Sequence, residues 1–159
     1  MQLSEILNGI ETSSRISDVE IKSISTSVKN AGPGCLFVCL PGKKTVLRSS
    51  AAVLRGAKAV ICKRKLPLPI PQIIVKNVRE ALSIACSNFY GRPTEKMMMI
   101  GVTGTNGKTS TTFMTKAVLE ANGIKTGLIG TIQCMAGDEK LEKVDEAYTT
   151  PRQIGRAHV

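Results

Sequence analysis

The chain has 159 residues, of which 42% are hydrophobic, and carries a formal net charge of +10. This composition is typical of a globular protein, and no run approaches the roughly 20 apolar residues of a membrane span. The start Met-Gln-Leu-Ser-Glu also lacks the features of a signal peptide, so we expect a cytoplasmic protein. Five cysteines without a Cys-x-x-Cys pair fit neither a disulfide framework nor a zinc site, so we expect reduced thiols.

The first 91 residues predict an alternating α/β domain. Cys35 and Cys39 lie four apart in one apolar run, so on a strand they share a face and pack together. The predicted elements, in chain order, are a helix at 3–7, a strand at 16–24, a turn at 32–34, a buried strand at 36–40, a helix at 50–54 ending at Gly56, a buried strand at 59–62, an extended surface connection through Pro67, Pro69 and Pro71, a strand at 73–75 and a helix at 79–90.

Residues 91–94, Gly-Arg-Pro-Thr, mark the expected domain boundary. Residues 97–100 are continuously apolar, as a strand buried on both faces of a parallel sheet should be. Further on, 126–129 predicts a short strand, and the acidic stretch 137–146 predicts an exposed hairpin or loop. The intervening helix ends at Asn122-Gly123, and its apolar face consists of Phe113, Ala117, Val118 and Ala121.

A glycine-rich loop joins the strand predicted at 97–100 to this helix. Residues 101–112 read Gly-Val-Thr-Gly-Thr-Asn-Gly-Lys-Thr-Ser-Thr-Thr, the order of a P-loop that binds ATP. Lys108 is the candidate catalytic residue, which would bridge the terminal phosphates, and Thr109 the candidate ligand of Mg2+, with Ser110 the weaker choice. The candidate ATP-binding residues are Gly104, Thr105, Asn106, Gly107, Lys108, Thr109 and Ser110.

The positive charge is concentrated in residues 32–92, which hold eleven basic side chains and one acidic side chain. Its densest part is Lys63-Arg64-Lys65. Such a block could steer nucleic acid, attract a diphosphate-bearing substrate or form a solvated surface. No aromatic residues are interleaved for base stacking, so we expect no nucleic-acid partner, and we expect no membrane partner.

The strict P-loop pattern fails at Val102, and the string Gly-Thr-Asn-Gly-Lys-Thr, with Gly101 and Thr103 before it, resembles the loop of the Mur ligases. The stretch 33–38, Leu40-Pro41-Gly42 and the stretch 52–61 resemble the first domain of that family, which binds UDP. Thr149-Thr150-Pro151 resembles the members that add the third amino acid of the peptidoglycan stem.

The resemblance implies an ATP-dependent amide ligase that activates UDP-MurNAc-L-Ala-D-Glu as an acyl phosphate and joins it to meso-diaminopimelate or L-lysine. It implies a small α/β UDP-MurNAc-peptide-binding domain at 1–91 and the start of a central domain with a parallel sheet and the ATP site at 92–152. Thr149 and Thr150 would then bind the muramoyl substrate. The family usually has an Asp-Ser-Arg triplet before the Pro-Gly turn, and Ser27 is our candidate for its serine.

Three departures limit the resemblance. The Asp-Gly-His element of the family is replaced by Lys43-Lys44-Thr45-Val46. The remainder of the ATPase domain and a third domain are absent, so we expect an N-terminal piece that exposes apolar surface, dissolves poorly and does not catalyse ligation alone. Residues 153–159 are interpreted as a non-native tail. The hypothesis rests on residues 154–159, which are what the string ATCGGAAGAGCACACGTC, the start of a common sequencing adapter, would encode.

Two alternatives stay open. Another member of the superfamily, such as a folylpolyglutamate synthetase, would carry the loop first, without about 90 preceding residues. A nucleotide-binding or nucleic-acid-binding module would use the basic block instead. The sequence does not indicate an oligomeric state.

Overall fold

The computed structural model describes residues 1–14, 17–42 and 44–141. The chain divides into two compact units, the first spanning Met1–Pro93 and the second beginning at Thr94. This division falls within the segment 91–94, where turn residues end the last helix of the first unit. Among the described residues, no helix combines the length and apolar content required to cross a bilayer.

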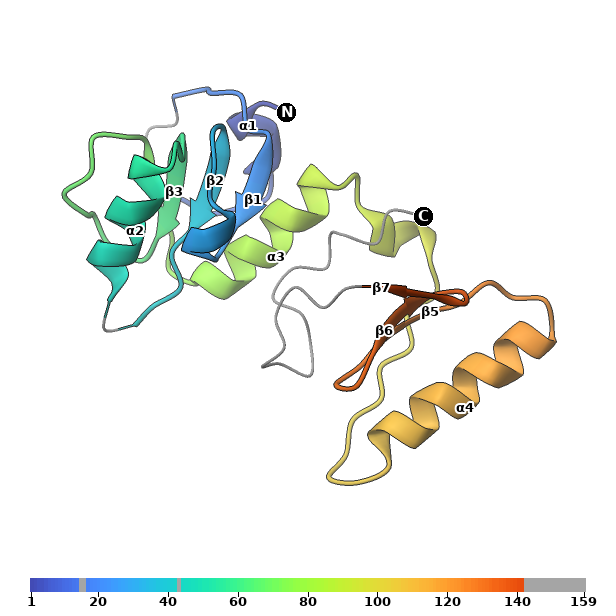
Figure 1. The fold of residues 1–159 in the computed structure, drawn as a ribbon. Coiled ribbons are helices and arrows are strands. Elements are labelled where there is room, and N and C mark those ends of the chain that lie inside the picture. Colours follow the sequence, from blue (N-terminus) through green and yellow to red (C-terminus); the bar gives the residue numbers. More distant parts are fainter. Residues whose placement is uncertain (15–16, 43, 142–159) are drawn as a thin grey trace. The chain divides into compact units, whose positions relative to one another are not determined.

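The first unit is built on a four-stranded parallel sheet of β1 (Ser23–Ser25), β2 (Cys35–Val38), β3 (Ala59–Cys62) and β4 (Gln72–Ile74). The strands lie side by side in sequence order, with Leu36 opposite Ala59 and Val60 opposite Gln72. Figure 1 shows the first three next to one another. The alternating α/β organisation and the parallel sheet are therefore confirmed for this unit.

Helices cover both faces of this sheet. On one face α1 (Leu3–Ile6) and α3 (Val78–Phe89) pack on Leu36, Val38 and Ile61. On the other face Ala52 of α2 (Thr45–Leu54) packs with a cluster that contains Cys35, Phe37, Cys39, Val60 and Cys62. Alternate residues of β2 and β3 thus face opposite layers, and the predicted packing of Cys35 and Cys39 on one face is confirmed.

Two element boundaries differ from the prediction. The helix α2 begins at Thr45, five residues before the predicted start, because Ser49 and Ala52 both become buried against the sheet. The strand predicted at 16–24 is confined to Ser23–Ser25, since only these residues pair with β2. The proline-rich connection is only partly a surface feature: Leu66 is buried, and Leu68 and Ile70 pack against the α2-side core.

Side-chain hydrogen bonds fasten the connections of the first unit. The Arg48 guanidinium donates to the Thr26 carbonyl at 2.7 Å, and Arg55 donates to the carbonyls of Ala31 and Lys29, both at 3.1 Å. These bonds attach the β1–β2 connection, which contains the short 3-10 helix η1 (Val28–Asn30), to α2. The segment after the carboxyl end of β1 is thereby hydrogen-bonded to the α2 region.

The second unit contains the 3-10 turn η2, which starts at the unit boundary (Pro93–Lys96), the helix α4 (Lys108–Ala121) and the strands β5 (Gly127–Ile129), β6 (Cys134–Ala136) and β7 (Glu139–Leu141). The three strands form an antiparallel sheet in sequence order. The predicted short strand is confirmed, and α4 ends as predicted before Asn122 and Gly123. Of the stretch 137–146, predicted as a hairpin or loop, residues 137–141 form the turn and second strand of the β6–β7 hairpin, and 142–146 lie outside the described residues.

Two predictions for this unit are wrong. Residues 97–100 form no strand, and Met98 is 89% exposed, because no described strand lies alongside to accept their hydrogen bonds: β5, β6 and β7 pair only with one another. The predicted apolar face of α4 is also not buried, since Val118 is 62% exposed and Ala117 and Ala121 are exposed. The buried side chain of α4 is instead Lys116, which pairs with Glu120.

Candidate phosphate-binding site

The glycine-rich loop leads directly into α4, and its two central glycines have backbone conformations that other residues rarely adopt. Gly104 has a φ of +150° and Gly107 a φ of +76°. A β-carbon at Gly107 would meet nothing closer than the Thr111 Oγ1 atom at 4.0 Å, and one at Gly104 nothing closer than the Asn106 carbonyl oxygen at 3.6 Å. The glycines are therefore required by the turn and leave the loop backbone open to a ligand.

The amino end of α4 supplies the hydrogen-bond donors of the loop. The Thr111 N–H donates to the Gly107 carbonyl at 2.9 Å and closes the first helical turn. The N–H groups of Lys108, Thr109 and Ser110 precede that bond, so no helical carbonyl is available to them. The first turn contains no acidic side chain, and the positive end of the helix dipole is not neutralised there. This arrangement favours an anion.

Lys108 is folded across its own loop. Its ammonium group donates to the carbonyl of Gly104 and, at 3.2 Å, to the carbonyl of Thr105. Thr105 and Asn106 are exposed at the tip of the loop. The positive charge of Lys108 thus lies over the same backbone segment as the free amides, where it can meet the terminal phosphates of a nucleotide.

The hydroxyl groups of α4 separate into engaged and free side chains. Thr112 and Thr115 donate to the carbonyls of Thr109 and Thr111, each at 2.8 Å. Among the hydrogen bonds of the described residues, none involves the Thr109 or the Ser110 hydroxyl, and Thr109 is the less exposed of the two. No group of three or more His, Cys, Asp or Glu side chains that could hold a metal occurs among the described residues. A metal at the loop would therefore depend on ligand phosphates.

Ser27 lies in the first unit, just past the carboxyl end of β1. Its N–H donates to the Ser25 Oγ atom at 3.1 Å, and the Ser25 hydroxyl donates to the Ser27 carbonyl at 2.9 Å. Its own side chain is half-buried and does not cap η1. Arg48, which the sequence did not mark as important, holds the neighbouring Thr26 carbonyl and so positions this segment. A lone arginine in a helix gives no sequence signal for such a role.

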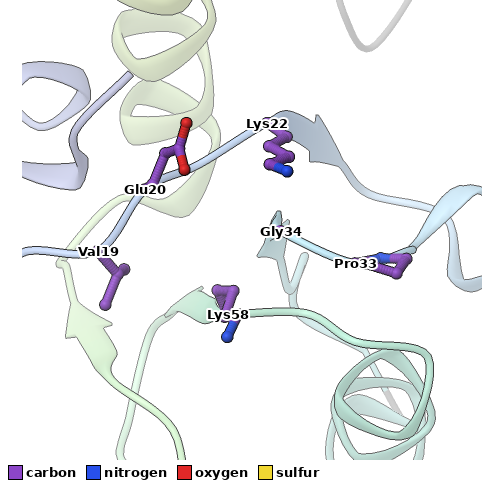
Figure 2. Close-up of a pocket in the computed structure, with 6 residues that line it drawn as sticks. All are labelled: Val19, Glu20, Lys22, Pro33, Gly34 and Lys58. Carbon is purple, nitrogen blue, oxygen red and sulfur yellow. The ribbon is translucent and has the colours of Figure 1, made fainter.

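Other predicted positions are not brought into a site by the described structure. Thr149, Thr150 and the tail 153–159 lie outside the described residues. An open depression of the first unit, lined by Val19, Glu20, Lys22, Pro33, Gly34 and Lys58, contains no predicted site residue. It lies at the amino ends of the strands (Figure 2), the edge opposite to the one where open parallel sheets bind ligands.

Three buried thiols, those of Cys35, Cys62 and Cys86, offer no activated nucleophile. Burial raises the pKa of Cys86 to about 11, and burial together with the nearby Cys39 raises that of Cys62 to about 11. Burial also raises the pKa of Cys35. All five cysteines are free, as predicted. Thiols with raised pKa values stay protonated near neutral pH, so these three are poor nucleophiles.

The loop belongs to a recognised sequence family. The family described as the Mur ligase middle domain matches residues 102–159. A UDP-N-acetylmuramoyl-L-alanyl-D-glutamate–2,6-diaminopimelate ligase from Bacillus cereus is 41% identical over 125 residues, which cover 77% of this chain and 26% of that protein. The ligase of the same name from Caldanaerobacter subterraneus subsp. tengcongensis is 38% identical and aligns with 97% of this chain and 32% of its own length.

Solved structures share the fold. A UDP-N-acetylmuramoyl-L-alanyl-D-glutamate–2,6-diaminopimelate ligase aligns with 88% of this chain and 29% of its own, with a TM-score of 0.70 and 20% identity. MurF from Acinetobacter baumannii aligns with 74% of this chain and 27% of its own, with a TM-score of 0.60 and 24% identity. The chain spans 32% or less of the length of these relatives. The middle-domain match and the sequence identity along nearly the whole chain show that it belongs to the Mur ligase family.

Proposed function

We propose that this chain provides the nucleotide-sugar-binding region and the ATP-binding loop of a cytoplasmic ligase that joins 2,6-diaminopimelate to UDP-MurNAc-L-Ala-D-Glu. The observation that carries the proposal is the loop at 101–107, with two glycines at positive φ, free amides at the start of α4 and Lys108 folded across it. The printed names of the curated relatives support this pair of substrates.

The reaction couples phosphoryl transfer to amide formation. The γ-phosphoryl group of ATP passes to the terminal carboxylate of the UDP-linked peptide and gives an acyl phosphate and ADP. The amine of diaminopimelate then attacks the activated carbonyl carbon, the carbon–oxygen bond to phosphate breaks, and an amide and inorganic phosphate result. Lys108 and the loop amides stabilise the charge that accumulates on the transferring group.

The residues of the loop fit a magnesium nucleotide. The Thr109 hydroxyl is free within the described structure and stands in the first turn of α4, and no protein carboxylate cluster competes for the metal. Thr109 would hold Mg2+ together with phosphate oxygens, and the ion would neutralise phosphate charge. Ser110 is more exposed and is the weaker candidate. In the first unit Ser27, and beyond the described residues Thr149 and Thr150, are proposed to bind the UDP-linked substrate.

ATP binding by the chain itself is the first test. Isothermal titration with ATP and Mg2+ should show one site, and Lys108→Ala should weaken binding roughly ten-fold or more, because a charge-assisted contact is lost. Thr109→Ala should reduce the gain in affinity that Mg2+ provides, whereas the neighbouring Ser110→Ala should leave it intact. Equal effects of the two hydroxyl variants would refute the assignment of the metal ligand.

A hybrid enzyme tests the chemistry. Residues 1–141 replace the equivalent part of the Bacillus cereus ligase, and release of inorganic phosphate is followed with each substrate omitted in turn. Release should require ATP, UDP-MurNAc-L-Ala-D-Glu and diaminopimelate together, and Lys108→Ala in the hybrid should lower kcat by about a hundred-fold or more. A folded hybrid that binds ATP but releases phosphate without the UDP-linked peptide would contradict the proposal.

A further inference from the structure

Two buried cysteines face each other at the ends of neighbouring strands in the first unit. The register of β2 and β3, which lie side by side in Figure 1, pairs Val38 with Ile61, and the Cys39 N–H continues the ladder by donating to the Ile61 carbonyl at 2.9 Å. Cys39 therefore lies opposite Cys62, the last residue of β3. Both side chains belong to the cluster on the α2 face, and each is 1% exposed. These two residues are here called the thiol pair.

Strand geometry sets the spacing of the thiol pair. Neighbouring strands lie about 4.8 Å apart, and side chains on the same face that share a rotamer keep roughly this spacing at sulfur. A disulfide requires an S–S distance of about 2.0 Å. Two metal–thiolate bonds placed end to end span about 4.6 Å, with the zinc–sulfur bond of about 2.3 Å as the scale. The spacing therefore suits a metal held between two sulfur atoms better than a disulfide.

The thiol pair has no third protein ligand among the described residues. Cys35 shares its face of the sheet but precedes Cys39 by four residues, which is about 13 Å along a strand. Cys86 packs on the opposite face, and no group of three or more His, Cys, Asp or Glu side chains that could hold a metal occurs in the described part of the chain. Zinc and calcium need more ligands than two. Cu+ is a soft cation that thiolates select, and two sulfur atoms in line satisfy it.

The surroundings of the thiol pair favour negative charge. The Cys39 thiol donates to the Thr45 carbonyl at 3.4 Å, so the pair lies beside the amino end of α2, where the helix dipole is positive. Lys44 is the N-cap residue of α2, and the exposed cations at 63–65 follow Cys62 directly. Burial, with the nearby Cys39 as a second cause, raises the pKa of Cys62 to about 11. The free thiols thus stay protonated, whereas a metal that neutralises most of the charge of two thiolates is stabilised.

We propose that the thiol pair is a binding site for a soft monovalent cation, Cu+. One Cu+ and two thiols give a bis-thiolate complex with a net charge of −1, and the two protons pass to solvent. Copper keeps its oxidation state, so the step needs neither an oxidant nor a reductant. The path to the site is short, because residues 41–42 and 63–65, which follow the two strand ends, are exposed. The inference does not depend on the proposed ligase activity.

The experiment titrates the complete chain with Cu+ in the absence of oxygen, against the competing chelator bicinchoninate. All proteins carry Cys134→Ser, because Cys134 is only half-buried and would bind copper by itself. The parent should bind a single Cu+ and release about two protons near neutral pH. Cys39→Ser and Cys62→Ser should each lower the affinity by more than about 100-fold, beyond the loss that a change outside the ligand set produces.

Cys86→Ser is the matched control. Cys86 is buried in the same unit, and burial raises its pKa to about 11, as for Cys62, but it packs on the other face of the sheet. Its substitution should leave the affinity for Cu+ unchanged. Circular dichroism at the helical band shows whether each variant is folded, and alanine variants of Cys39 and Cys62 replace any serine variant that is not.

Two measurements on the unsubstituted thiol pair do not depend on the folding of variants. X-ray absorption at the copper edge should show two sulfur neighbours. The urea midpoint should rise with Cu+, because a ligand that binds the folded state stabilises it.

Four outcomes would overturn the inference. Bicinchoninate removes all copper from the parent, or Cys39→Ser and Cys62→Ser bind Cu+ as tightly as the parent does. Cys86→Ser loses as much affinity as these two variants, so that position on the sheet is irrelevant. The urea midpoint falls with Cu+, which means that thiols of the unfolded chain hold the metal.

Discussion

The substitution Gly56→Ala tests how closely two connections of the first unit must approach. Gly56 follows α2 with a φ of +99°, and a β-carbon there would lie 2.9 Å from the Cα atom and 3.1 Å from the nitrogen of Pro33. Its carbonyl also accepts a hydrogen bond from the Gly34 N–H at 3.1 Å. Both neighbouring atoms are backbone, so the clash can be relieved only by displacing the turn before β2.

Gly91→Ala is the matched control. Gly91 has a φ of +73°, and a β-carbon there would meet nothing within 4 Å. Both substitutions restrict the unfolded chain equally, and both force alanine into a left-handed conformation at about 1–2 kcal/mol. Only Gly56→Ala adds the close contact, which we expect to cost about 1–3 kcal/mol more, as overpacking does.

Urea unfolding followed by circular dichroism at the helical band measures the difference. With a denaturant slope of about 1–3 kcal/mol per molar, an extra 2 kcal/mol lowers the midpoint of Gly56→Ala by about 1 M relative to Gly91→Ala. Both variants should unfold at a lower urea concentration than the wild type. Equal midpoints for the two variants would refute the argument, because the contact with Pro33 would then contribute nothing to stability.

Three further predictions concern buried side chains of the first unit and the thiols. Ser49→Ala should raise the urea midpoint, by up to about 1 kcal/mol in the free energy of unfolding, because the buried Ser49 hydroxyl has no hydrogen-bond partner and alanine favours the helix; a lower midpoint would contradict this. Asn88→Ala should destabilise the first unit by about 1–3 kcal/mol, since the Asn88 amide donates to the Ile6 and Asn8 carbonyls at 3.0 and 2.8 Å, at and just after the end of α1. Hydrogen exchange of the α1 amides should therefore become faster, and unchanged protection of α1 would contradict the prediction. Iodoacetamide at neutral pH should label the half-exposed Cys134 well before the buried Cys62 and Cys86, whose pKa values of about 11 leave little thiolate. Peptide mass spectrometry after timed quenching measures the order of labelling, and earlier labelling of Cys62 or Cys86 would contradict the prediction.

Elements whose signals are local were predicted well. The aliphatic run at 59–62 forms β3 with the predicted bounds, and the glycine after α4 ends that helix. The start of α2 was missed because residues 45–49 have little helical periodicity. They become helical when Ser49 and Ala52 pack against the sheet. The prediction of the buried face of α4 was wrong for a similar reason, since the side of a helix that is buried depends on which strands lie beside it.

The candidate site could be predicted to different degrees in the two units. The loop at 101–107 and the first residues of α4 can be predicted from sequence, because the glycines, Lys108 and Thr109 are close together in the chain and their geometry follows from a single turn and helix. The hydrogen bond from Arg48 to the Thr26 carbonyl could not be predicted from the sequence, since it joins residues 22 positions apart. That Thr109 binds a metal and Ser27 a substrate stays a prediction.

The sequence by itself determined the family resemblance, the phosphate loop and the order of strands and helices in the first unit, because turns, caps and hydrophobic periodicity act over a few neighbouring residues. Only the tertiary structure decided whether the apolar run 97–100 pairs as a strand, and only the parallel order of β2, β3 and β4 places Lys44 and Lys76 at the same edge as residues 63–65. Strand pairing depends on partners that are distant in the chain, and no local pattern specifies which of them are present.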